Sequence, residues 1–348
     1  MKCIVCEAEI AQKGEMCAQC GFDMKIPSFL SEKQYKEWLE QVVKPCQREW
    51  LRKKEILERK AEEQRKEREY KGRIEKEASC LGTFGMDFSV FVRSDGTVKY
   101  LGSNEEIKRE TRKWAGIVAV SAGDFHVLGL DRGGRVLSAG KNNLNQCDVF
   151  DWKNVVQIAA RGDVSAALDA KGRVYVCGDL EEGLGSARKW SRIKKIALGN
   201  KHILGLCEDG TVKSVGCNLD DQCTQVPKWN QVIDIAAGEY HSLALCRDGS
   251  VQASGSDIDG ECAVESWREI VKLQGASGSS VGIDRKGRLW RAGRFADIAL
   301  QEDSSVIQIV LGVKDTDAAA AALKEGRLQI YRQDAKGGEW LTLSNAEE

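Results

Sequence analysis

A motif of 38 or 39 residues recurs through most of this 348-residue chain. The tryptophans that begin successive copies are Trp114, Trp152, Trp190, Trp229 and Trp267. Their spacings are 38, 38, 39 and 38 residues. Seven copies also carry a turn glycine that precedes, by two positions, an apolar residue: Gly96, Gly134, Gly172, Gly210, Gly249, Gly287 and Gly326. Seven copies at a fixed period of this length predict a repeat architecture.

The copy at 229–267 shows what each repeat is expected to build. VIDIAAG, from Val232, and HSLAL, from His241, place apolar residues as short strands do. Asp-Gly at 248–249 supplies the positive φ that a tight hairpin needs. SVQASG is then a third strand, and Glu261–Val264 is predicted to be a short fourth strand. A four-stranded sheet cannot bury both of its faces alone, so seven copies predict a mainly β fold, a seven-bladed β-propeller.

These residues also carry a family resemblance. The run of Ala-Ala-Gly, His, Leu-x-Leu, Asp-Gly-x-Val, Gly and Gln resembles the repeats of the regulator of chromosome condensation family over residues 79–345. The copies are short and uniform, and in this they look similar to bacterial members. The resemblance implies the propeller fold, whereas functions differ within the family. Its founding member promotes nucleotide exchange on a small GTPase through an inserted wedge, and these repeats contain no comparable insertion.

The first 24 residues contain four cysteines with the spacing C-x2-C-x10-C-x2-C. These are Cys3, Cys6, Cys17 and Cys20. Two such knuckles complete a tetrahedral thiolate site, so residues 1–24 are predicted to be a zinc ribbon that holds one structural Zn²⁺. The alternative is a pair of redox or incidental C-x2-C motifs. Lys2, Lys13 and Lys25 stand against four nearby acids, which does not favour nucleic-acid binding by this segment.

Residues 28–78 are predicted to be a helical, charge-rich linker. Ser31 is a plausible N-cap, and a helical apolar face follows it. Pro45 is expected to interrupt the helix at the end of that face. From residue 47 to 77, acids precede bases by four positions, as in Glu49–Lys53. The only heptad-like series ends in polar residues, so the pattern favours a solvated rod over a coiled-coil dimer.

Composition narrows the compartment and the class of partner. The formal charge of -1 provides no basic field that would attract nucleic acid. Nine of the thirteen cysteines lie outside the zinc motif, and Cys147, Cys223 and Cys262 occupy equivalent positions in different blades. Equivalent positions are too far apart to bridge, which favours reduced thiols and a reducing compartment. The N-terminus lacks the apolar core of a signal peptide, and no stretch has the length of a membrane span. We therefore expect a cytoplasmic protein that does not bind a membrane.

No catalytic motif stands out. His126, His202 and His241 each lie eight residues before a turn glycine, but the other blades carry Phe, Val, Ser or Ala there. These substitutions disfavour a metal site, and the family resemblance implies a structural hydrogen-bonding role for the three histidines. No nucleophile elbow, phosphate loop or paired-acid motif is present, so we expect neither an enzyme nor a small-molecule substrate.

The loops of a four-stranded blade separate the charges. The first and third connections lie on one face of the ring and the second lies on the other, and the first-and-third face collects most of the loop acids. The predicted partner-binding residues there are Asp124, Phe125, Asp179, Glu181, Glu182, Asp220, Asp221, Glu239, Tyr240, Asp257 and Asp259. Such a face suits a protein with a basic surface and repels phosphate backbones. The alternative is that loop acids serve turns and solubility alone.

Residues 79–348 are thus expected to form a non-enzymatic protein-interaction scaffold, with the ribbon and the rod tethering or presenting what it binds. Two alternatives remain. One is a nucleic-acid-associated or GTPase-regulatory factor, which the family resemblance implies, and the other is a propeller-type enzyme inhibitor.

Overall fold

The computed structural model describes Cys3 and residues 31–77, 82–86, 88–93, 95–286, 288–294, 306–314, 317–324, 327–334 and 337–343. The chain divides into two compact units, Met1–Tyr70 and Lys71–Glu348. Among the described residues, no helix is long and apolar enough to cross a membrane.

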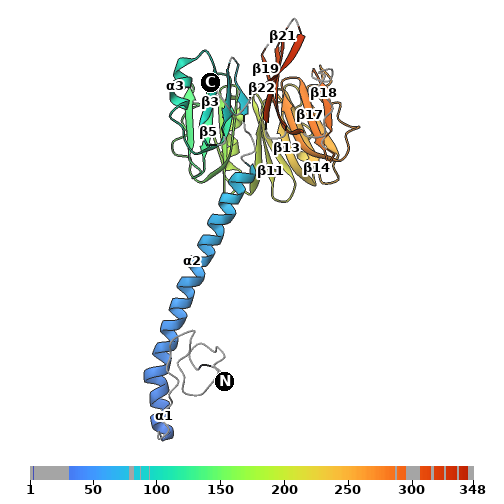
Figure 1. The fold of residues 1–348 in the computed structure, drawn as a ribbon. Coiled ribbons are helices and arrows are strands. Elements are labelled where there is room, and N and C mark those ends of the chain that lie inside the picture. Colours follow the sequence, from blue (N-terminus) through green and yellow to red (C-terminus); the bar gives the residue numbers. More distant parts are fainter. Residues whose placement is uncertain are drawn as a thin grey trace. The chain divides into compact units, whose positions relative to one another are not determined.

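Helix dominates the described part of the first unit (Figure 1). Helix α1 (Glu32–Trp38) begins at Ser31, whose side chain and backbone form a capping box with Gln34. The predicted N-cap is therefore confirmed. A π-helical turn (η1, Leu39–Val43) continues into α2 (Lys44–Glu77). Pro45 was expected to interrupt the helix, but the wider π turn accommodates the residue that lacks an N–H, so the helix runs on.

Charged side chains cover the described part of α2. All side chains from 51 to 60 are exposed, and Lys53 reaches Glu49 at 2.7 Å, as the spacing predicted. Such exposed pairs each contribute only about 0.3–0.5 kcal/mol. The helix is therefore supported by many small terms rather than by one buried face.

Seven antiparallel sheets are described in the second unit, and they are numbered as blades in chain order. Blade 1 consists of β1 (Gly82–Phe84), β2 (Phe88–Val92) and β3 (Val98–Gly102), and blade 2 of β4 (Ile117–Ala122), β5 (His126–Asp131) and β6 (Val136–Gly140). Blade 3 consists of β7 (Val155–Arg161), β8 (Val164–Asp169) and β9 (Val174–Gly178), and blade 4 of β10 (Ile193–Leu198), β11 (His202–Cys207) and β12 (Val212–Gly216).

The remaining blades continue the same order. Blade 5 consists of β13 (Val232–Ala237), β14 (His241–Cys246) and β15 (Val251–Gly255), and blade 6 of β16 (Ile270–Ala276), β17 (Ser279–Asp284) and β18 (Leu289–Gly293). Blade 7 consists of β19 (Val306–Lys314), β20 (Asp317–Lys324), β21 (Arg327–Asp334) and β22 (Gly337–Leu343). Short helices follow three of the blades: α3 (Glu105–Thr111), η2 (Glu181–Lys189) and η3 (Val226–Lys228).

The expected fourth strand is present only in the last of these sheets. Blades 1 to 6 have three described strands each, and residues 261–264 lie in turns instead of a strand. The prediction of a fourth strand there was wrong because side chains satisfy the backbone of this loop. Asp257 accepts from the Cys262 amide at 2.8 Å, and Glu261 accepts from the Asp259 amide at 2.8 Å. In blade 7, β22 pairs with β21, so the chain end completes its own blade rather than joining blade 1.

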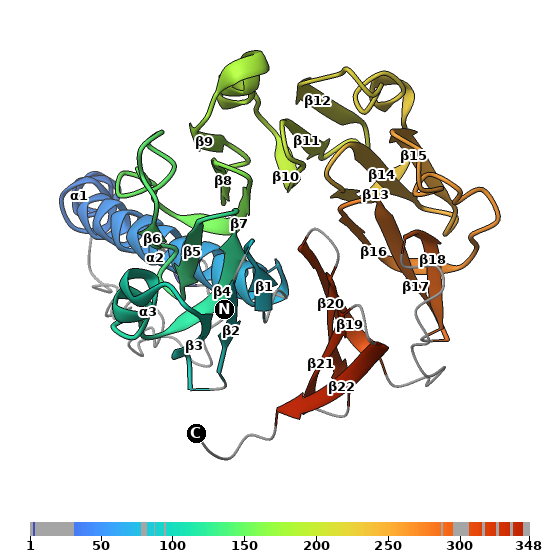
Figure 2. The same cartoon turned by 90° about the horizontal axis from the view of Figure 1, so that it is seen from above.

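The first strands of the blades form a closed circle (Figure 2). Each of β1, β4, β7, β10, β13, β16 and β19 contacts the next, and β19 also contacts β1. The second strand of each blade follows on the outer side, as the strand orders show. This is the arrangement of propeller blades around one axis.

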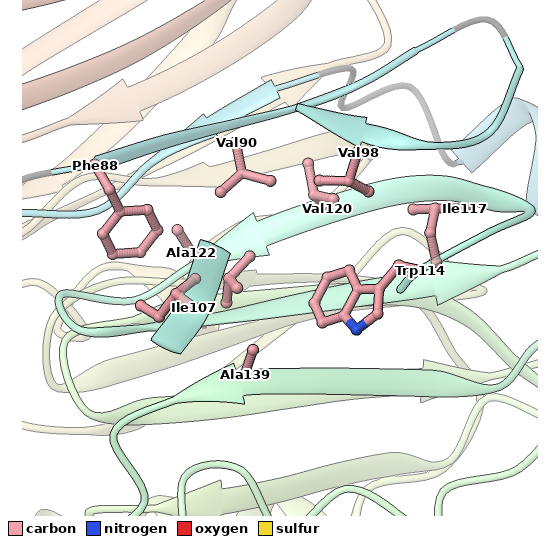
Figure 3. Close-up of a cluster of buried hydrophobic side chains, with 10 residues drawn as sticks. Phe88, Val90, Val98, Ile107, Trp114, Ile117, Val120, Ala122 and Ala139 are labelled. Atoms are coloured by element: carbon pink, nitrogen blue, oxygen red, sulfur yellow. The ribbon is translucent and has the colours of Figure 1, made fainter. Parts of the chain in front are cut away.

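Apolar side chains fill the space between neighbouring blades. Between blades 1 and 2, Val90, Ile107 and Ile117 are at most 2% exposed and pack around Trp114 (Figure 3). Trp152, Trp229 and Trp267 are also buried, which confirms that the tryptophans at repeat starts are packing residues. Trp190 is only half-buried.

The second connection of each blade is a hairpin, as predicted. Five of its turn glycines have φ values between 76 and 84°: Gly96, Gly134, Gly172, Gly210 and Gly249. We call this end of the blades the hairpin face, made of the described residues within 93–97, 131–135, 169–173, 207–211, 246–250 and 284–288.

Candidate functional site

The other end of the blades carries the first and third connections. We call it the connection face, and define it as residues 123–125, 161–163, 199–201, 238–240 and 277–278, with 141–148, 179–189, 217–225 and 256–262. Antiparallel strands alternate in direction, so these connections necessarily emerge at one end of the ring. All eleven predicted partner-binding residues lie on this face.

Buried histidines join neighbouring blades directly below this face. His126 Nε2 lies 2.8 Å from Ser165 Oγ of the next blade, and His241 Nε2 lies 2.9 Å from Ser280 Oγ. The Ser165 hydroxyl donates to the Gln146 carbonyl at 2.7 Å, so it accepts from the imidazole N–H. The histidines are therefore inter-blade hydrogen-bond donors, which confirms the structural role expected for them. His202 makes the same contact with Ser242 at 3.1 Å.

These imidazoles are held neutral. Burial lowers the pKa of His126 and of His241 to about 4, and that of His202 to about 3. Each Nδ1 is buried and has no hydrogen-bond partner among the described residues. Protonation of Nδ1 would create a second buried N–H donor that has no acceptor. Low pH should therefore weaken the packing of these histidines between blades.

A glycine makes room for each of these rings. An ideal Cβ on Gly123 would lie 2.2 Å from His126 Cε1, and one on Gly199 or Gly238 would lie 2.0 Å from the histidine of its own blade. In blade 3 the histidine is replaced by Val164 and the glycine by Arg161. Because no imidazole lies over residue 161, that residue can carry a side chain. Glycine and histidine therefore behave as one structural pair.

A ladder of backbone hydrogen bonds links the first connections around the axis. The Asp124 amide donates to the Gly162 carbonyl at 2.9 Å, and the Met86 amide donates to the Asp124 carbonyl at 3.0 Å. On the other side, the Asn200 amide donates to the Glu239 carbonyl at 3.2 Å. These bonds give the inner part of the face a fixed backbone.

Arg161 lies among the acids of this inner part. Its side chain is half-buried and makes no hydrogen bond or ion pair within the described residues, although Glu239 and Asp124 act on it electrostatically. Burial lowers the pKa of Arg161 and the two carboxylates oppose that change. Burial also raises the pKa of Asp124, with Arg161 opposing. Glu239 is further held by Ser277, whose hydroxyl donates to it, so the inner acids are partly compensated.

The outer acids of the face are much less compensated. Ion pairs join Lys141 to Asp163 (3.7 Å), Lys201 to Glu181 (3.8 Å) and Arg294 to Asp259 (2.6 Å). Within the described residues no ion pair reaches Asp179, Glu182, Asp220, Asp221 or Asp257. Lys141, Lys201 and Arg294 are thus already paired, whereas Arg188 and Lys189 have no ion pair within the described residues. Acids still outnumber bases on the connection face, so a surplus of negative charge remains.

Three apolar side chains on this face are exposed on blades 4 and 5. Tyr240 was predicted as an anchor and is 43% exposed, while Leu219 and Ile258 are 89% and 88% exposed. The sequence interpretation missed the last two. The available signal was that both occupy the position of Asn143 in blade 2, so an apolar residue replaces a polar one in equivalent loops.

The predicted anchor on blade 2 is in a different state. Phe125 is 38% exposed, but Lys141 Nζ lies over its ring, 5.4 Å from the centroid. In blade 5 the residue equivalent to Lys141 is Ser256, so Tyr240 is not covered in this way. The structure therefore separates two anchors that the sequence had treated alike.

The repeat-equivalent cysteines are half-buried thiols with little reactivity. Burial raises the pKa of Cys147 to about 11 and that of Cys262 to about 12, and it also raises that of Cys223. A thiolate is the reactive form, so these groups are poor nucleophiles at neutral pH. Of the four predicted zinc ligands, Cys3 is 1% exposed, and Cys6, Cys17 and Cys20 lie outside the described residues.

Comparison with known proteins identifies the repeats. The family model for the regulator of chromosome condensation (RCC1) repeat matches residues 117–146, 193–222 and 232–261, which fall on blades 2, 4 and 5. Blades 2, 4 and 5 are thus similar to RCC1 repeats. The three matched blades are also the ones that carry the glycine–histidine pair.

Two further comparisons agree. The human regulator of chromosome condensation is 28% identical over 173 residues, which cover 40% of this chain and 41% of that protein. The chain thus matches about two fifths of the length of such curated relatives. The ectodomain of the receptor kinase CR4 from Physcomitrella patens superposes with a TM-score of 0.58 at 16% identity, covering 73% of this chain and 72% of that one. Human WBSCR16 gives a TM-score of 0.54 at 18% identity, covering 67% and 84%. Likeness at these identities shows the propeller fold alone.

Proposed function

We propose that this protein is a non-enzymatic interaction scaffold whose connection face binds a basic surface of a partner protein. The observation that carries the proposal is the unequal pairing on that face. Lys141, Lys201 and Arg294 are already matched with acids, whereas Asp179, Glu182, Asp220, Asp221 and Asp257 have no ion-pair partner within the described residues and outnumber the unpaired bases Arg188 and Lys189. A basic surface would supply the missing charges and would be steered to this face.

The same charges disfavour nucleic acid as the ligand. Phosphate backbones would be repelled by these loops, and neutralising phosphates requires clustered Lys and Arg. The function implied for the wider family, action on a GTPase or on chromatin, is therefore the weaker proposal for this face. The described cysteines of the blades are free thiols, which supports a reducing, cytoplasmic location.

We also propose that Cys3, Cys6, Cys17 and Cys20 hold one structural zinc ion. Cys3 is buried in the first unit, as a thiolate ligand of a closed site would be. Four thiolates leave no open coordination position, so the metal would supply folding free energy and no chemistry. The ribbon and the helical segment would then tether or present the partner that the propeller binds. One zinc per chain, lost in the Cys17→Ser variant, is the expected result of metal analysis.

Hydrogen–deuterium exchange with a captured partner tests the proposal on the propeller. Backbone amides of 199–201, 217–225, 238–240 and 256–262 should be protected in the complex, while the hairpin face at 207–211 and 246–250 should exchange as in the free protein. Protection confined to the hairpin face would overturn it.

A further inference from the structure

Leu219 and Ile258 are almost completely exposed although the loops that carry them are well ordered. The Asn218 side chain accepts from the Cys223 amide at 2.7 Å, and the Asp257 side chain accepts from the Cys262 amide at 2.8 Å. Gln222 and Glu261, both buried, accept from amides two residues earlier. The exposure of the two aliphatic side chains is therefore imposed by a fixed loop shape.

The same loop occurs in blade 2 with a polar residue at the position of Leu219 and Ile258. Asn142 accepts from the Cys147 amide at 2.8 Å, and Asn145 has the left-handed φ of 65° that Asp221 has at 60°. The position equivalent to Leu219 and Ile258 is Asn143. An aliphatic side chain is thus not needed at this position to build the loop, and its presence there in blades 4 and 5 requires another reason.

Tyr240 lies on the first connection of blade 5, next to the loop of Ile258. Its carbonyl accepts from the Ser256 amide at 3.0 Å, which fixes it to that loop. Burial raises the pKa of Tyr240, and the negative charges of Glu239 and Asp220 act on it in the same direction. Ser254 Oγ ties the loops together from below, since it donates to the Asp221 carbonyl at 2.6 Å. Leu219, Tyr240 and Ile258 therefore belong to one patch across two adjacent blades.

We propose that this patch is the apolar subsite for a basic, amphipathic segment of the partner protein. The proposal rests on the proposed function and specifies the partner's chemistry. Asp220, Asp221 and Asp257 flank the three apolar side chains and have no ion-pair partner within the described residues, so lysines or arginines that alternate with apolar residues complement the patch. A fixed loop loses little conformational entropy on binding, which makes such a patch an efficient anchor.

Two synthetic peptides of equal length and equal lysine content provide the test on the full-length chain. One alternates lysine with leucine, and the other alternates lysine with serine. The double variant Leu219→Asn/Ile258→Asn installs the residue that blade 2 already carries in this loop, so the fold is retained. It should weaken the lysine–leucine peptide by about tenfold for each side chain, as expected for losing one buried aliphatic group. Binding of the lysine–serine peptide should not change.

Phe150→Ser is the matched control, because Phe150 is 81% exposed but lies outside the connection face. An equal loss in that variant, or no loss in the double variant, would overturn the apolar subsite. The fourfold variant Asp220→Asn/Asp221→Asn/Asp257→Asn/Asp259→Asn should weaken the binding of both peptides. If it weakens neither, the proposed function itself fails. If the fourfold variant loses binding but the Leu219→Asn/Ile258→Asn variant does not, the proposed function stands and only the apolar subsite is rejected.

Discussion

The hairpin face and the connection face use acidic residues in opposite ways. On the hairpin face, acids serve their own turns: Asp169 accepts from Arg173 at 2.7 Å, and Asp209 accepts from the Thr211 amide at 3.0 Å. On the connection face, Asp179, Asp221 and Asp257 accept hydrogen bonds within their loops but have no basic partner among the described residues, and no side-chain partner of either kind is described for Glu182 and Asp220. The hairpin face thus uses its turn aspartates for folding, whereas the connection face also carries acids, such as Glu182 and Asp220, that its loops do not need. Three measurements test this difference between the two faces.

The largest effect is expected from acid, through the histidines below the connection face. The unfolded chain takes up protons on histidine near pH 6.5, whereas the folded chain resists protonation down to a pKa of about 4 for His126 and His241 and about 3 for His202. Stability is therefore complete above pH 6.5 and falls as the pH drops toward 4. The free energy of unfolding should decrease by on the order of 2 kcal/mol per histidine between pH 7 and pH 5.

Urea unfolding at the two pH values measures this loss. The variant His126→Val, which installs the residue of blade 3, should show about two thirds of the pH dependence because one titrating group is gone. A urea midpoint that is the same at pH 7 and pH 5 would contradict the buried, neutral state of the three histidines.

A smaller effect is expected on the hairpin face. Asp284 is buried and accepts from the Lys286 and Arg288 amides, from Arg288 Nε and from Trp290 Nε1. Burial alone would raise its pKa, but these bonds together lower it to about 2. Asp284→Ala should cost about 2–3 kcal/mol, since it leaves buried donors unsatisfied. The contribution of the wild-type carboxylate is present above pH 4 and is lost as the pH falls toward 2.

Thermal unfolding of Asp284→Ala beside Asp209→Ala checks this prediction. Asp209 caps an exposed turn, so its replacement should be the milder one. Equal loss in both variants would show that burial of the aspartate does not set the contribution of the turn.

Repeat spacing predicted much of the fold, because turn glycines and alternating apolar residues act locally. The hairpins and the radial arrangement of blades followed from those signals. The expected fourth strand at 261–264 was wrong because caps such as Asp257 compete with a ladder for the same amides. A single sequence cannot tell which of the two satisfies the backbone.

The candidate site was predictable in charge but not in shape. The acids of the connection face followed from loop order alone. The exposure of Leu219 and Ile258 depends on a left-handed residue at Asp221 and at Gly260, together with side-chain caps several residues away. Asp259 and Glu181 are already paired, with Arg294 and Lys201, and both ion pairs join neighbouring blades. These features arise from the assembled ring, so no local pattern shows them.

Association kinetics with the captured partner test the central claim most directly. The test variant replaces Asp220, Asp221, Asp257 and Asp259 by Asn, which keeps the loop shape because Asn stands at positions equivalent to Asp221 and Asp257 in blade 2, Asn145 and Asn142. The control variant replaces Asp151, Glu208, Glu265 and Glu269, which lie outside the connection face, by Asn or Gln. At low salt the test variant should associate about tenfold more slowly and with a weaker salt dependence, while the control should match the wild type. Equal association rates for the test variant and the wild type would contradict it.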